Sequence, residues 1–178
     1  AVTTTSLTGS IFYMFNHGFS TAALFLVLGF LVKRRGSAQV DAFGGVQKTA
    51  PVLAGMFLFA GLATMSLPGI SNFIGEFMVL AGAWSRHPVY VAVATLGMVL
   101  GAVYILLTYK RTMTGPLTQA TKAHVTTDLT GLEKAALTPL VILLLVFGFF
   151  PRPMLHVIEP VAHQTMSIVV ETDPPPES

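Results

Sequence analysis

Four long apolar stretches determine what this chain of 178 residues can fold into. A hydrocarbon core about 30 Å thick takes roughly 20 helical residues to cross, and each stretch is about that long or longer. None of them shows the period-two alternation that marks a membrane barrel. We therefore predict an all-α, polytopic membrane protein whose four transmembrane helices cover approximately residues 9–32, 51–84, 88–109 and 132–150.

Composition supports this fold class, because only 10% of the residues are charged and 53% are hydrophobic, against roughly 25% charged in a soluble domain. The net charge of +2 gives no reason to expect a nucleic-acid partner. The chain has no cysteine, which excludes disulfides, thiolate metal sites and iron–sulfur ligation.

The basic residues predict an orientation. Two loops, at 33–50 and 110–134, hold most of them, and only Arg86 and Arg152 lie elsewhere. Positive residues are enriched on the cytoplasmic side of membrane proteins, so we expect both loops to be cytoplasmic in a bacterial inner membrane. The basic residues of the two loops are Lys33, Arg34, Arg35, Lys48, Lys110, Arg111, Lys122 and Lys134.

The second apolar stretch is too long for one straight span. Its residues, 51–84, would form a helix of about 51 Å at 1.5 Å per residue. Pro68-Gly69 lies inside it and predicts a break, after which Ser71 or Asn72 would cap a second half-helix. Backbone groups freed at that depth need protein or a hydrated cavity to satisfy them, so the break predicts an internal polar pathway.

Glu76 follows this break and is the first candidate for proton transfer. We place it within about the first turn of the second half-helix, where the helix dipole favours the ionised carboxylate and the low dielectric opposes it. Ionisable residues inside the membrane are costly and commonly functional. The alternative is a structural glutamate neutralised by one salt bridge.

His17 is the second candidate for proton transfer. Tyr13, His17 and Thr21 lie four residues apart and predict one polar stripe on an apolar helix. Histidine changes charge most readily near neutral pH, although Gly18 allows the alternative of a packing face with a core histidine. We expect the other histidines, His87, His124, His156 and His163, to be solvated, and no cofactor or metal motif is present.

The chain lacks an initiator methionine and a signal peptide, so we expect a piece of a longer protein. We divide it into a transmembrane part at 1–160 and a short outer-side tail at 161–178. That tail contains "ETDPPPES", and its composition predicts disorder.

Three segments carry a resemblance to a known family: "NHGFSTAALFLVLGFL", "DAFGGVQKTAPVLAGMFLFAGLATMSLPGISNFIGEF" and "DLTGLEKAALTPLVILLLVFGFFPRPML". They resemble the C-terminal part of the antiporter-like, proton-translocating chains of proton-pumping NADH-quinone oxidoreductase, respiratory complex I. The last segment, with Asp128 and Glu133, resembles the M-type branch, and so does a glutamate at 76 where sister chains usually have lysine.

The resemblance implies an inverted-repeat fold in which residues 51–84 are the broken helix of the second repeat. It implies that Glu76 lies at the outer end of a proton path and that His17 lies on the hydrated central axis. The chain would be a subunit of an oxidoreductase without redox chemistry of its own. It would bind no cofactor, because NADH, FMN, iron–sulfur clusters and quinone lie elsewhere in the complex.

The expected partners are the other membrane subunits of complex I, especially neighbouring antiporter-like chains, and the lipid bilayer. The alternatives are a subunit of a cation/proton antiporter or of a hydrogenase-linked relative, or a non-catalytic membrane scaffold.

Overall fold

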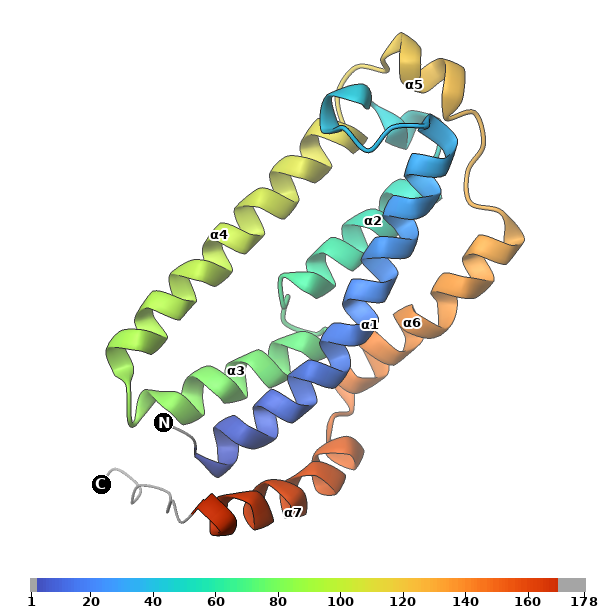
Figure 1. Ribbon diagram of the computed structural model, residues 1–178. Helices are drawn as coiled ribbons and strands as arrows, with labels where there is room; N and C mark the ends of the chain where they lie inside the picture. The colour runs from blue at the N-terminus through green and yellow to red at the C-terminus, as the bar shows by residue number, and fades with distance from the viewer. Residues whose placement is uncertain (1–2, 170–178) are drawn as a thin grey trace.

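The computed structural model describes residues 3–169, and every regular element in that range is helical, as predicted (Figure 1). Among the described residues there are seven α-helices and two short 3-10 turns, η1 and η2, which follow the first helix. In chain order the elements are α1 (Thr4–Arg35), η1 (Val40–Ala42), η2 (Val46–Lys48), α2 (Pro51–Thr64), α3 (Ser71–Trp84), α4 (Pro88–Met113), α5 (Gln119–His124), α6 (Gly131–Phe149) and α7 (Arg152–Val169).

Three of these helices, α1, α4 and α6, are long and apolar enough to cross a membrane. A pair of segments, Val40–Lys48 with Pro51–Thr64, passes the same test only when taken together, and the two parts meet at an angle of 115°. The predicted second stretch is present as α2 and α3, each of 14 residues and therefore about 21 Å long. Each half alone is shorter than the hydrocarbon core, so both are needed to cross it.

The break between α2 and α3 includes Pro68-Gly69, as predicted. Gly69 has φ +96°, and Ser66 has φ +56°, which is uncommon for a residue with a side chain. The glycine at 148 in α6 lets that helix lie directly against the Gly69 carbonyl. The predicted cap was wrong: Ile70 holds the N-cap position without a side-chain hydrogen bond, and Ser71 is already helical.

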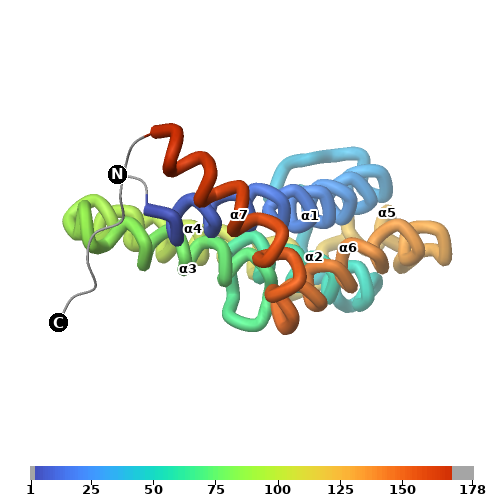
Figure 2. Tube along the Cα trace, turned by 90° about the horizontal axis from the view of Figure 1, so that it is seen from below, coloured from blue at the N-terminus to red at the C-terminus, as the bar shows by residue number. Residues whose placement is uncertain are grey.

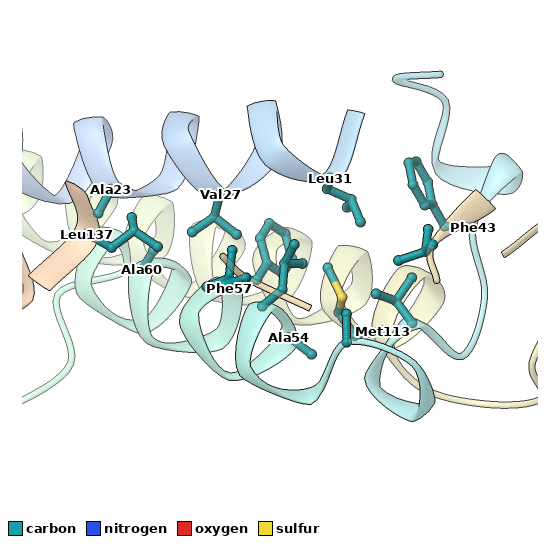
Figure 3. Close-up of a cluster of buried hydrophobic side chains, with 14 residues drawn as sticks. Ala23, Val27, Leu31, Phe43, Ala54, Phe57, Ala60, Met113 and Leu137 are labelled. Carbon is teal, nitrogen blue, oxygen red and sulfur yellow. The ribbon is translucent and has the colours of Figure 1, made fainter. Parts of the chain in front are cut away.

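Helix α1 is the centre of the arrangement, since it contacts α2, α3, α6 and α7 (Figure 1). Its Ala23, Val27 and Leu31 face the apolar side of α2, where Phe57 lies among alanines (Figure 3). Met113 and Leu137 bring the ends of α4 and α6 into the same cluster. This core fixes the half of the molecule between the break and the basic loops.

The two basic loops lie at the same end of the molecule (Figure 1). Gly45 donates from its backbone amide to Thr114 O at 3.0 Å, and Thr118 donates to Gly44 O. Helix α5, which we did not predict, lies in the second of these loops. Helix α3 and the start of α4 lie at the opposite end, so the chain passes from the basic end to the other end through the break.

Helix α7 contradicts part of the predicted tail. Residues 161–169 are helical, and α7 lies across the end of the bundle opposite the basic loops (Figures 1 and 2). Ile158, Ala162 and Met166 are buried at spacings of four, which gives α7 an apolar face to pack on the rest of the chain. The acidic, proline-rich end of the predicted tail, at 170–178, falls outside the described residues.

Candidate functional site

Glu76 lies in the second turn of α3 rather than the first, so the helix dipole acts on it more weakly than we predicted. The side chain is partly buried and lines a pocket of about 240 Å³. Thr64 and Met65, at the end of α2, form one wall, and α4 forms the other. The α4 residues there are Ala94, Gly97, Met98 and Gly101, and the alanine and the two glycines leave space beside Glu76.

Three glycines bring α3 and α1 into backbone contact beside this pocket. A Cβ atom on Gly75 would lie 2.8 Å from Tyr13 Cα, and one on Gly82 would lie 2.6 Å from the Ser6 amide nitrogen. From the other side, a Cβ on Gly9 would lie 2.6 Å from Met78 Cβ. Carbon atoms normally approach to about 3.5–4.0 Å, so only glycine permits this spacing. The residue next to Gly75 is Glu76, which is thereby held against α1.

The polar stripe predicted on α1 is present as a set of side-chain contacts. The Thr21 hydroxyl oxygen lies 3.3 Å from His17 Nδ1, and the Tyr13 and His17 rings lie 5.4 Å apart between centroids. Both Tyr13 and His17 are partly buried. The stripe therefore runs along two turns of α1 towards the level of Gly75.

Tyr13 is the member of this stripe nearest to Glu76 along α3, because its backbone lies against Gly75, the residue before Glu76. Tyr104 on α4 acts electrostatically on the Tyr13 hydroxyl. The sequence led us to expect Glu76 and His17, on separate helices, to belong to one proton path, but it named no side chain between them. In the structure Tyr13 lies between them: its ring packs on the His17 ring, and its backbone lies against Gly75, the residue before Glu76.

A buried amide cluster, formed by Asn16, Ser20 and Asn72, was not predicted. Asn72 Nδ2 donates to Ser20 Oγ at 2.8 Å, and Asn16 Nδ2 donates to the Phe12 carbonyl at 2.8 Å. All three side chains are fully buried. The Asn72 contact ties the start of α3 to α1, and Asn72, as the second residue of the helix, is not at its N-cap. The signal in the sequence was two asparagines within apolar segments.

A second polar cluster closes the basic end of the molecule. Arg34 donates from Nη1 and Nη2 to the two carboxylate oxygens of Glu133, at 3.0 and 2.6 Å. The same guanidinium donates to the carbonyls of Phe30, Thr127 and Asp128. Both side chains of the pair are largely buried, at 9% and 13% exposure. This bidentate pair fixes the start of α6 to the end of α1.

Asp128 caps a helix that is distant in sequence. Its carboxylate accepts hydrogen bonds from the backbone amides of Val52 and Leu53, at 2.8 and 2.9 Å, which are orphan donors at the start of α2. Desolvation opposes ionisation, but these amides and that of Leu129 outweigh it and lower the pKa of the Asp128 carboxyl. Asp128 and Glu133 therefore serve structure at the end remote from Glu76.

The remaining histidines do not join the site. His124, His156 and His163 are exposed, as predicted, whereas His87 is partly buried at the start of α4, against Tyr90. Within residues 3–169, no group of three or more metal-ligating side chains is close enough to hold a metal ion.

Comparison with known sequences identifies the family. The sequence profile described as NADH:quinone oxidoreductase/Mrp antiporter, TM, matches residues 1–101. A Mycobacterium tuberculosis protein named NADH-quinone oxidoreductase subunit M is 47% identical over 175 residues, which is 98% of this chain and 31% of that protein. A protein of the same name from Rickettsia typhi is 38% identical over 155 residues, covering 87% of this chain and 31% of its own length. The chain thus spans about a third of the length of these relatives.

Comparison with solved structures agrees. A chain of respiratory complex I from Thermus thermophilus superposes with a TM-score of 0.77 at 30% identity, over 89% of this chain and 34% of that one. A chain of the Mrp complex from Dietzia has a TM-score of 0.75 at 21% identity, over 88% and 37%, which indicates a shared fold. This chain belongs to the NADH:quinone oxidoreductase/Mrp antiporter membrane family.

Proposed function

We propose that this chain is part of a membrane subunit of a redox-driven proton pump, in which it carries the outer half of a proton path coupled to NADH:quinone oxidoreduction. The observation that supports this most strongly is the position of Glu76. Its carboxylate lines a pocket at a broken helix, beside a stripe of polar side chains that includes His17. Ionisable residues at such positions in membranes commonly serve as proton relays.

In this mechanism His17 and Glu76 are the proton-transfer residues. Glu76 accepts a proton that arrives along the stripe on α1 and releases it to the outside when a neighbouring charge moves. The imidazole of His17 suits the inner step, because it changes charge easily near neutral pH. The pocket is large enough to hold several water molecules, each of which occupies about 30 Å³.

The proposed orientation in the membrane follows from the basic loops at one end of the molecule. We place the basic loops in the cytoplasm of a bacterial cell, following the positive-inside rule, with the membrane segments in the inner membrane. Glu76 lies in the half-helix that leads from the break to the opposite end, which on this assignment is the outer half. Helix α7 would then lie at the outer surface.

The proposed partners are the other membrane subunits of complex I, above all the neighbouring antiporter-like chains, and the lipid bilayer. NADH, FMN, iron–sulfur clusters and quinone would bind elsewhere in the complex. The matching Thermus thermophilus chain belongs to respiratory complex I with bound NADH, which supports this assignment.

The test replaces Glu76 with glutamine in the full complex, reconstituted into vesicles. We expect NADH oxidation measured with an uncoupler to persist and proton translocation to be abolished or strongly reduced. Glu159→Gln is the matched control, since Glu159 is an exposed carboxylate on α7. Translocation at the wild-type rate in Glu76→Gln would contradict the proposal. Normal translocation combined with poor assembly would favour a non-catalytic scaffold.

A cation/proton antiporter subunit is the second candidate, favoured by the family description and by the shared fold with the Mrp chain. The same vesicles discriminate between the two. Proton movement that follows NADH oxidation supports the pump, whereas proton movement driven only by an imposed sodium gradient supports the antiporter.

A further inference from the structure

A proton that moves between the two proposed proton-transfer residues, His17 and Glu76, needs a group between them. Tyr13 contacts His17 and also lies against Gly75, next to Glu76. Tyr13 lies one helical turn from His17 on the same face of α1, with ring centroids 5.4 Å apart and an angle of 36° between the planes. Its backbone lies against Gly75, the residue before Glu76, and the Glu76 carboxylate is close enough to act on the charge of the Tyr13 hydroxyl. A tyrosine hydroxyl can donate and accept a hydrogen bond at the same time.

The packing of α1 against α3 fixes this intermediate position. Ser6 lies against Gly82, Tyr13 lies against Gly75, and Ser20 contacts Asn72, so the two helices run antiparallel. In this register Tyr13 is at the level of Glu76, and His17 is one turn closer to the break. A proton that moves from His17 to Glu76 therefore passes the Tyr13 ring.

Other hydroxyl groups lie near the Tyr13 hydroxyl. The buried Ser66 side chain, at the break, lies within reach of Tyr13, although the two hydroxyls do not meet the geometry of a formed hydrogen bond. Tyr104 on α4 also acts electrostatically on the Tyr13 hydroxyl. Gly75 allows the backbone of Tyr13 to approach α3 closely, which a larger residue at 75 would prevent.

We propose that the Tyr13 hydroxyl is the relay group that passes protons from His17 to Glu76, a role that rests on the proposed function of those two residues. The hydroxyl gives its proton to the Glu76 carboxylate and takes one from the His17 imidazolium. One O–H bond forms on the glutamate, and one N–H bond breaks on the histidine. Tyrosine is neutral before and after the step, and rotation of its hydroxyl restores the starting arrangement.

The competing explanation is that Tyr13 only fills space between α1 and α3. Phenylalanine fills the same space without the hydroxyl, so Tyr13→Phe separates the two roles. Tyr109→Phe is the matched control, because Tyr109 stacks on Phe57 in the apolar part of the molecule, with centroids 6.1 Å apart. Both variants are made in the full complex and reconstituted into vesicles, with Glu76→Gln measured alongside.

We expect Tyr13→Phe to assemble, to oxidise NADH with an uncoupler present, and to translocate protons about tenfold more slowly or worse, while Tyr109→Phe pumps normally. Wild-type pumping by Tyr13→Phe, with pumping lost in Glu76→Gln, would overturn the relay and leave the proposed function standing. Wild-type pumping by both Tyr13→Phe and Glu76→Gln would overturn both proposals.

A second measurement covers the case in which Tyr13→Phe does not assemble. Fluorinated tyrosine incorporated at position 13 keeps the shape and the hydroxyl but makes the hydroxyl more acidic. If the hydroxyl carries protons, pumping should decline at a lower pH than in the unmodified complex, because the group loses its proton sooner. An unchanged pH profile would overturn the relay.

Discussion

Replacing Gly75 with alanine tests whether the close approach of α1 and α3 sets the geometry of the site. A Cβ atom at position 75 would lie 2.8 Å from the N, Cα and Cβ atoms of Tyr13. Because carbon atoms normally approach to about 3.5–4.0 Å, the two helices would have to separate by roughly 1 Å. Such a displacement moves Glu76 on α3 away from Tyr13 and His17 on α1. Proton transfer between side chains requires hydrogen-bond distances, so the larger separation should slow it.

Two opposing free energies decide the effect of Gly75→Ala on stability. Overpacking costs about 1–3 kcal/mol, while alanine gains about 1 kcal/mol over glycine in a helix. We therefore expect a loss of stability of at most about 2 kcal/mol. Pumping should fall by much more, because a misplacement of 1 Å can reduce the rate by about 10²-fold.

The assay combines thermal unfolding of the purified complex with proton translocation in vesicles. Gly29→Ala is the control, since no atom outside its own helix segment lies within 4 Å of a Cβ at that position of α1 among the described residues. It should pump normally and be at least as stable as the wild type. If Gly75→Ala also pumps normally without loss of stability, the helix contact does not set the site.

Two further predictions concern the basic end. Arg34→Lys should destabilise the complex by about 3 kcal/mol, because lysine cannot form the bidentate pair and would leave the negative charge of the largely buried Glu133 poorly paired. Thermal unfolding measures this loss, and an unchanged unfolding midpoint would contradict the prediction. The pKa of Asp128 is lowered in the folded state, so its ionised carboxylate stabilises the fold. This contribution to the free energy of unfolding is complete above the ordinary aspartate pKa of about 3.9 and is lost as the pH falls through the lower pKa of the folded state. The stability of Asp128→Asn should therefore change less with pH in that range than the stability of the wild type. Asp41→Asn, in the 3-10 turn η1, is the control. An equal pH dependence in Asp128→Asn and the wild type would contradict the capping role of Asp128.

Local sequence patterns predicted the parts of the fold that depend on nearby residues. The four-residue spacing of Tyr13, His17 and Thr21 predicted their contacts, because residues at i and i+4 share a helix face. Pro68-Gly69 predicted the break for an equally local reason, the lost donor and the freedom of glycine. Helix α7 was missed although its pattern was readable. Ile158, Ala162 and Met166 form a regular four-residue repeat of apolar residues, which marks an amphipathic helix rather than a long apolar span.

Contacts between distant segments could not be predicted in the same way. Asn72 was expected to cap its own helix, but it contacts Ser20, a competition that depends on how α1 and α3 pack. Asp128 caps α2 across a sequence separation of 76 residues, and nothing near either segment signals the pairing. Sequence alone likewise placed Glu76 in the membrane without indicating that Tyr13 lies against the neighbouring Gly75, because the close approach of α1 and α3 depends on glycines from both helices.

The central claim is that Glu76 gains and loses a proton as the pump works, and infrared spectroscopy can test it directly. Redox-triggered difference spectra of the full complex report carboxyl groups that change protonation during turnover. A carboxyl C=O band that appears in the wild type and in Glu159→Gln but is missing from Glu76→Gln is the predicted result. The same carboxyl bands in the wild type and in Glu76→Gln would contradict the claim.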